Sequence, residues 1–128
     1  MAACDWRIAA PATGFRMPGL RFGIVLGTRR LAALVGADAA HEILVTSRSF
    51  EAAEAERLGF VQRLAEPAAW PEIVRGIVEA QRLDGIATAR LKARVKPDMR
   101  ACDMAALVES AATPGLKDRI RSFRSAKN

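Results

Sequence analysis

The sequence is poor in the residues that usually carry metal or redox chemistry. Its 128 residues include two cysteines, one histidine and no tyrosine. Cys4 and Cys102 lie far apart without CxxC spacing, and we find no secretory leader, so we expect two reduced thiols in a cytoplasmic protein. His41 has no Cys, His or Asp partner at metal-ligand spacing. We therefore predict no metal site, and we interpret His41 as a surface residue rather than an acid/base group.

Three further absences narrow the class of protein. The longest apolar run is far shorter than the roughly 20 residues that a bilayer-spanning helix needs, so no membrane segment is predicted. The Gly-x-Ser-x-Gly motif of a serine nucleophile does not occur. Aromatic residues make up only 5% of the chain, few are interleaved with basic residues, and no nucleic-acid-binding motif is present. We therefore expect neither a membrane nor a nucleic acid as partner.

Positive charge is concentrated at one end of the chain. Residues 1–85 hold 10 Lys+Arg and 10 Asp+Glu, whereas residues 86–128 hold 10 Lys+Arg and 4 Asp+Glu, which accounts for the whole net charge of +6. A basic surface attracts phosphates, including those of a nucleotide-bearing ligand. The plainer alternative is that these basic residues form a solvated helix face.

The length of the chain suffices for one domain with a buried core.

The segment from residue 37 to residue 64 predicts two short helices followed by a strand. Asp38 is a good N-cap for a helix that ends near Thr46, and Ser49 is expected to cap a second helix that ends at Gly59. Phe60–Leu64 is the predicted strand. The other expected elements are a strand at 5–9, an extended segment at 15–24, and helices at 28–35, from 71, at 86–96, around 104–111 and from 116.

The last helix is expected to be amphipathic. Its predicted inward residues are Leu116, Ile120 and Phe123, and its predicted outward residues are Lys117, Arg119, Arg121, Arg124 and Lys127.

Several residues of the central segment follow a recognisable order. They are Ala40, Glu42, Ile43, Leu44, Thr46, Arg48, Ala53, Glu54, Ala55, Gly59 and Val61. Their order resembles that of the enoyl-CoA hydratase/isomerase (crotonase) family, although Ser47 stands where that family usually has glycine. Upstream, the segments at 4–9, 15–23 and 27–31 also resemble family motifs.

The resemblance implies an α/β fold, a crotonase-like C-terminal half with mainly helices and a few short strands. Residues 1–66 would form the C-terminal part of the core, and residues 67–128 a helical region for trimerisation. Family members are about twice as long, so we expect this chain to be the C-terminal half and inactive alone. The implied partners are an acyl-CoA thioester and further copies of the chain, as a trimer or a dimer of trimers.

The resemblance also indicates candidate site residues. The substrate-binding positions are Met17, Gly19, Leu26 and Gly27, and the residues expected to meet the phosphates of coenzyme A are Arg119, Arg121, Arg124 and Lys127. Coenzyme A would enter as part of the thioester, with no tightly bound cofactor.

No catalytic residue can be assigned from the sequence. A hydratase of this family has a glutamate directly after the proline that corresponds to Pro18, but here Gly19 occupies that position and cannot transfer a proton. Relatives that lack such a glutamate carry out isomerase, decarboxylase or other thioester chemistry. The alternative is a non-catalytic module for thioester binding or oligomer assembly.

Overall fold

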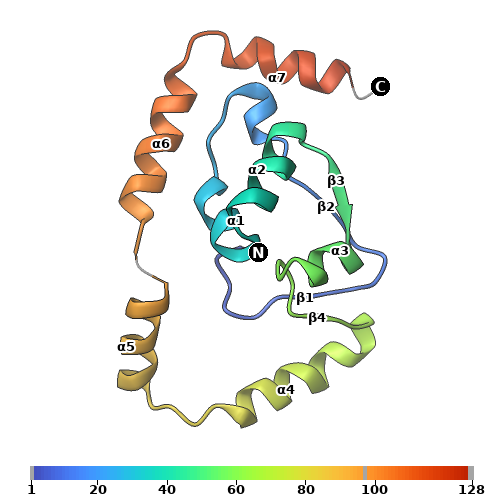
Figure 1. The fold of residues 1–128 in the computed structure, drawn as a ribbon, viewed down its shortest axis with the longest axis vertical. Helices are drawn as coiled ribbons and strands as arrows, with labels where there is room; N and C mark the ends of the chain where they lie inside the picture. The colour runs from blue at the N-terminus through green and yellow to red at the C-terminus, as the bar shows by residue number, and fades with distance from the viewer. Residues whose placement is uncertain (1, 97, 127–128) are drawn as a thin grey trace.

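Short strands and helices of the first 66 residues form a small core, and four longer helices follow it (Figure 1). The computed structural model describes residues 2–96 and 98–126. The elements are β1 Ile8–Ala9, β2 Gly14–Arg16, the 3-10 helix η1 Gly19–Phe22, α1 Thr28–Val35, α2 Ala37–Thr46, β3 Ser49–Glu51, α3 Ala52–Arg57, β4 Arg63–Leu64, the 3-10 helix η2 Pro67–Ala69, α4 Trp70–Ala80, α5 Gly85–Val95, α6 Arg100–Ala112 and α7 Leu116–Ser125.

Two small ladders join segments that are distant in the sequence. β1 runs parallel to β4, with Ile8 opposite Arg63, and β2 runs antiparallel to β3, with Phe15 opposite Phe50. Parallel pairing requires a long connection, which here contains β2, β3 and the first three α-helices. The prediction of a mainly helical α/β structure with a few short strands is confirmed.

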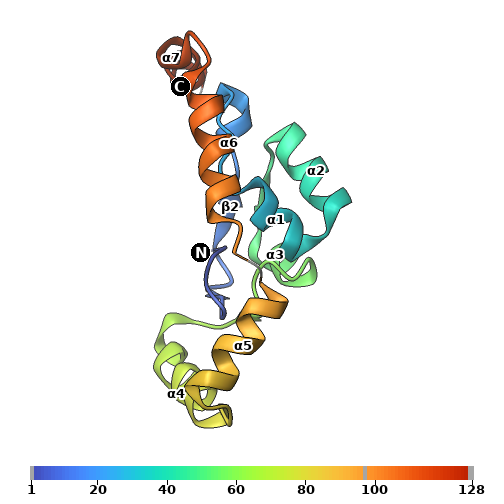
Figure 2. The same cartoon turned by 90° about the vertical axis from the view of Figure 1, so that its left-hand side faces the viewer.

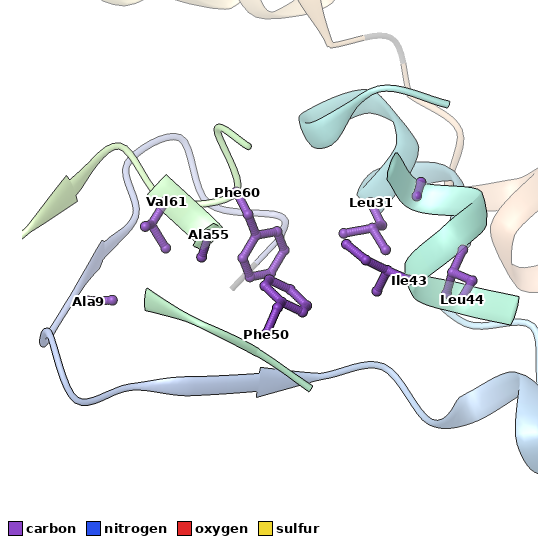
Figure 3. Close-up of a cluster of buried hydrophobic side chains, with 9 residues drawn as sticks. Ala9, Leu31, Ile43, Leu44, Phe50, Ala55, Phe60 and Val61 are labelled. Atoms are coloured by element: carbon purple, nitrogen blue, oxygen red, sulfur yellow. The ribbon is translucent and has the colours of Figure 1, made fainter. Parts of the chain in front are cut away.

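Aromatic packing organises the interior. The ring of Phe15 lies 5.5 Å from that of Phe50 and 5.2 Å from that of Phe60, with distances taken between centroids. Figure 3 shows Phe50 and Phe60 between Leu31 and Ile43 on one side and the segment around Val61 on the other. Burial of such large apolar side chains is the main stabilising contribution to this core.

A buried arginine ties the N-terminal segment to the end of the core. Arg7 is only 5% exposed, and its Nε donates to the carbonyl oxygen of Phe60 at 2.6 Å. Its guanidinium also donates to the carbonyl oxygen of Cys4 at 2.7 Å. The buried positive charge is therefore stabilised by backbone dipoles.

Helices α4 to α7 extend around the core as an open arm, which we define as residues 67–126 (Figures 1 and 2). Within the described part of this arm no residue is fully buried. Large apolar side chains are exposed on every one of its helices, for example Val78, Leu91, Val108 and Ile120. Apolar surface of this kind usually marks an interaction surface.

The predicted helix starts around the central segment are wrong. α2 begins at Ala37 after Gly36, so Asp38 lies in its first turn rather than at the N-cap. Ser49 lies in strand β3 and α3 begins only at Ala52, because pairing with β2 satisfies this backbone and places Phe50 in the core. Tertiary packing here overrides a local capping preference.

The extended elements are also shorter than predicted. The strand expected at 5–9 is only Ile8–Ala9, and that expected at 60–64 is only Arg63–Leu64. The segment at 15–24 leaves β2 at Arg16 and folds into η1, since Pro18 and Gly19 favour a turn.

On α7, one residue predicted to face inward is exposed and one predicted to face outward is half-buried. Leu116 and Phe123 are half-buried as expected, but Ile120 is 37% exposed. Arg119, predicted to point outward, is half-buried and donates from Nε to the carbonyl oxygen of Phe22 at 2.9 Å. Uncapped carbonyl groups of η1 and of the turn before α7 attract the guanidinium inward.

Candidate functional site: the loop at 17–28 and the basic C-terminal helix

The four candidate substrate-binding residues lie in one loop, residues 17–28, which we call the substrate loop. The backbone of its first half is closed by three hydrogen bonds, from Arg21 N to Pro18 O at 3.0 Å, from Gly23 N to Leu20 O at 3.0 Å and from Ile24 N to Gly19 O at 2.9 Å. Met17 packs against the hydrophobic core and anchors one end of the loop. The loop is thus a defined turn rather than an extended strand.

Gly19 is required by the shape of this turn. A Cβ atom at this position would lie 2.9 Å from the carbonyl oxygen of Ile24, closer than such contacts normally are. The oxygen belongs to the backbone, so it cannot move without changing the turn. A glutamate at position 19 therefore does not fit the loop as it stands.

The second half of the substrate loop presents a different surface. Leu26 is 66% exposed, and Gly27 has a φ of 73° with open space where a side chain would be. The hydroxyl oxygen of Thr28 is buried and has no hydrogen-bond partner among the described residues. These positions lie at the N-terminus of α1, which is open on the side of Gly27.

The arm holds the substrate loop from two sides. Val25 N donates to Ser110 Oγ of α6 at 3.0 Å. Phe22 accepts the hydrogen bond from Arg119 of α7, and its ring lies 5.4 Å from that of Phe123. The conformation of the loop therefore depends on residues that follow it by 85 positions or more.

Glu42, Arg48 and Glu54, which belong to the segment at 37–64, have a structural role. The guanidinium of Arg48 donates to Glu42 at 2.6 Å and to Glu54 at 2.7 Å, which clamps α2 to α3. These hydrogen bonds lower the pKa of both carboxyls. Both glutamates are therefore kept ionised, which suits an ion-pair clamp rather than a proton donor.

Among the described residues, every carboxyl with a clearly shifted pKa has that pKa lowered. Besides those two glutamates, the carboxyls with a clearly shifted pKa are Asp5 and Asp98, and in both hydrogen bonds from basic side chains lower the pKa to about 2. A catalytic acid usually needs a raised pKa. His41 is exposed, and no cluster of three metal-ligating side chains occurs at residues 2–96 and 98–126.

The candidate residues for coenzyme A phosphates are in different environments. Arg119 is engaged with backbone carbonyls, as described above. Arg121 is exposed and pairs with Asp118 at 2.7 Å, and Arg124 is exposed. Lys127 lies outside the described residues. The arrangement thus leaves Arg121 and Arg124 accessible on the outer side of α7.

Three of the surface concavities involve the arm. One, of about 560 Å³, is lined by residues of α7 that include the candidates Arg121 and Arg124. A second, of about 510 Å³, lies between β2, η1 and α7 and includes the candidate Arg119. A third, of about 990 Å³, lies between the β1–β4 edge and α4 and contains none of the candidate residues. Sequence reasoning missed Arg16 and Arg21, which also line the second concavity; the signal for them was two basic residues that flank the Pro18-Gly19 turn.

Comparison with known proteins shows the family. The sequence model described as enoyl-CoA hydratase/isomerase matches residues 1–107. A short-chain-enoyl-CoA hydratase of Clostridioides difficile is 43% identical over 68 residues, which cover 51% of this chain and 44% of that protein. A peroxisomal fatty acid beta-oxidation multifunctional protein, MFP2, of Arabidopsis thaliana is 39% identical over 69 residues, covering 52% of this chain and 10% of that protein.

A solved structure extends the similarity into the arm. A crystal structure from Bordetella parapertussis, described as an enoyl-CoA hydratase/isomerase, has a TM-score of 0.90 and 50% identity, covering 95% of this chain and 52% of that chain. The chain spans about half the length of the Clostridioides difficile and Bordetella parapertussis relatives. It belongs to the enoyl-CoA hydratase/isomerase family.

Proposed function

We propose that this chain is the C-terminal half of a protein that acts on acyl-CoA thioesters. The observation that carries the proposal is the family match over residues 1–107 together with the well-defined substrate loop. In this proposal the loop contributes Met17, Gly19, Leu26 and Gly27 to the acyl site. Stabilisation of an enolate-like charge would need backbone amide donors, which we assign to the other half of the protein.

We propose that the reaction is not hydration by a pair of glutamates. Gly19 stands in place of one of these glutamates. A glutamate cannot simply be put back at position 19, because its Cβ atom would lie 2.9 Å from the carbonyl oxygen of Ile24. Isomerisation or other thioester chemistry that needs fewer carboxylates fits better. Arg121 and Arg124 are proposed to meet coenzyme A phosphates, with Lys127 as a further candidate and Arg119 holding the substrate loop instead.

Activity measurements test the first part. We expect this chain alone to give no hydration of a short enoyl-CoA above the uncatalysed rate, because loss of even one oxyanion donor costs about 10²–10³ in rate. Gly19→Glu in the full-length protein should not create hydratase activity, and Gly19→Ala should lower the stability of the fold by about 1–3 kcal/mol. Hydration of a short enoyl-CoA by the chain alone, or by the full-length Gly19→Glu variant, would contradict the proposal.

Calorimetry tests the phosphate contacts in the full-length protein. Arg121→Ala and Lys127→Ala should each weaken coenzyme A binding by about 1.5–3 kcal/mol, with a smaller effect at high salt. Arg75→Ala, on an exposed position of α4, is the control. Equal affinity of all three variants for coenzyme A would mean that the basic residues of α7 form a solvated face with no ligand.

A second candidate function is oligomer assembly, favoured by the exposed apolar side chains of the arm. Val74 and Val78 of α4, Leu91 and Val95 of α5 and Val108 of α6 are each at least 51% exposed. We propose that they are covered by further copies of the chain, as a trimer or a dimer of trimers. Light scattering at micromolar concentration should show an oligomer, and a stable monomer would contradict this assignment.

A further inference from the structure

One face of helix α6 packs against the junction between the substrate loop and α1. The half-buried residues of α6 are spaced by three or four positions, as a single helix face requires; they are Asp103, Ala106, Leu107, Ser110 and Ala111. On the opposite side of the helix, Met104 is 59% and Val108 is 60% exposed. The face that carries Asp103 and Ser110 is therefore the one that contacts the core.

Two polar contacts fix the position of this face along the core. The carboxylate oxygens of Asp103 lie 3.4 Å from Nε of Arg29 and 3.3 Å from Nε of Arg30, in the first turn of α1. About two helical turns further on, the Oγ atom of Ser110 accepts a hydrogen bond from the backbone N–H of Val25 at 3.0 Å. Contacts at both ends of one face set the register of α6 against the substrate loop.

The second half of the substrate loop has little hydrogen bonding of its own. Within the described part of the chain, the backbone amides of Leu26 and Gly27 donate no hydrogen bond, and that of Val25 donates to Ser110. The hydroxyl of Ser110 in turn donates to the carbonyl oxygen of Leu107 at 2.9 Å, so its hydrogen is used within α6 and its lone pairs face the loop. Ser110 is thus the group that holds this part of the loop in place.

We propose that Ser110 is a positioning residue that sets which length of acyl chain the substrate loop prefers. Leu26 directly follows Val25 and is 66% exposed, so the direction of its side chain depends on the backbone that Ser110 fixes. Gly27, with a φ of 73°, would otherwise give the backbone unusual freedom at this point. The inference rests on the proposed function, in which Leu26 and Gly27 belong to the acyl site. Ser110 acts through Val25 and not by touching the substrate.

Two measurements on the full-length protein test this role. Calorimetry with butyryl-CoA and octanoyl-CoA gives the ratio of the two affinities, and hydrogen exchange detected by mass spectrometry reports on the peptide that contains Val25. Ser110→Ala should change the ratio about 3-fold or more, since a single methylene in an apolar pocket is worth about 10-fold or more. Exchange at Val25 should become about 10-fold faster, because the amide loses its acceptor. Alanine favours the helix, so α6 should keep its fold.

Two further variants separate positioning from a general loss of structure. Ser110→Thr keeps a hydroxyl that can bond within the same helical turn, and should restore both the ratio and the exchange rate. Glu109→Ala changes an exposed neighbour on α6 and should alter neither. An unchanged ratio in Ser110→Ala, including equal weakening of both ligands, or unchanged exchange at Val25 would overturn the inference alone. Absence of acyl-CoA binding by the unmodified protein would overturn the proposed function and this inference with it.

Discussion

The core at residues 2–66 and the arm at residues 67–126 are stabilised in different ways. Every fully buried side chain among the described residues lies between Arg7 and Val61. The arm instead contacts the core through separate local contacts, such as Lys92 with Asp5, Ser110 with Val25 and the ring of Phe123 with that of Phe22. Hydrophobic burial holds a fold cooperatively, whereas scattered polar contacts at the surface contribute little each. The arm is therefore suited to rearrange or to bind other chains.

Truncation of a large side chain should show the greatest difference between the two regions. Phe60→Ala in the core should lower the free energy of unfolding by about 3–5 kcal/mol, because Phe60 is 1% exposed and its loss leaves a cavity. Val78→Ala in the arm, 65% exposed, should change it by no more than about 0.5 kcal/mol. Urea denaturation measures both, and similar losses would contradict the division into core and arm.

The two inward-facing arginines offer a second comparison. Arg7→Met should destabilise the whole fold by about 2–3 kcal/mol, since it removes charged donors from the buried carbonyl of Phe60. Arg119→Met should instead loosen only α7 and η1, because Arg119 is half-buried and lies at their contact. Hydrogen exchange would detect faster exchange confined to those two elements. Global acceleration in Arg119→Met would argue that the arm is part of one cooperative unit.

Two glycines with the same backbone conformation provide a smaller contrast. Gly59 in the core has a φ of 76° and Gly115 in the arm has a φ of 79°. Alanine at either position should cost about 1–2 kcal/mol for the left-handed conformation. Gly59→Ala should cost more, since its Cβ would lie 3.3 Å from the backbone oxygen of Leu34. Thermal unfolding of the two variants would show whether the close contact or the conformation dominates.

The contact of Asp5 with α5 should give the smallest effect, and it depends on pH. Hydrogen bonds from Lys92 and Lys96 lower the pKa of Asp5 from 3.8 to about 2, so the folded state favours the ionised form. The stabilisation is present above about pH 4 and is lost as the pH falls toward 2. It should stay below about 1 kcal/mol because the groups are exposed.

A carboxyl titration by NMR can measure this pKa directly. In Lys92→Ala/Lys96→Ala the Asp5 pKa should return toward its ordinary value. In 1 M salt the shift should shrink, because the charges are exposed to solvent. An unchanged pKa in the double variant would show that α5 does not rest on Asp5 in solution.

The predictability of the two regions from sequence differs as well. The helix expected at 28–35 has the predicted bounds, and the helices expected from 71, at 86–96 and from 116 begin within about one residue of the prediction; α6, expected around 104–111, begins earlier, at Arg100. The family followed from spaced motif residues in 37–64. The start of α3 did not follow, because Ser49 is a good N-cap locally and only pairing with β2 places it in a strand.

What the sequence by itself determined was the helical content, the mainly helical α/β class, the family and the absence of a glutamate after Pro18. Tertiary structure decided where the candidate residues lie and what they contact. Arg119 faces inward because carbonyls of η1 meet α7, and Gly19 is confined by the Ile24 carbonyl. Arg16 and Arg21 come together only because α7 places Phe123 between β2 and η1. Local spacing specifies which residues share a helix face, whereas contacts across about 100 residues depend on packing that no local pattern contains.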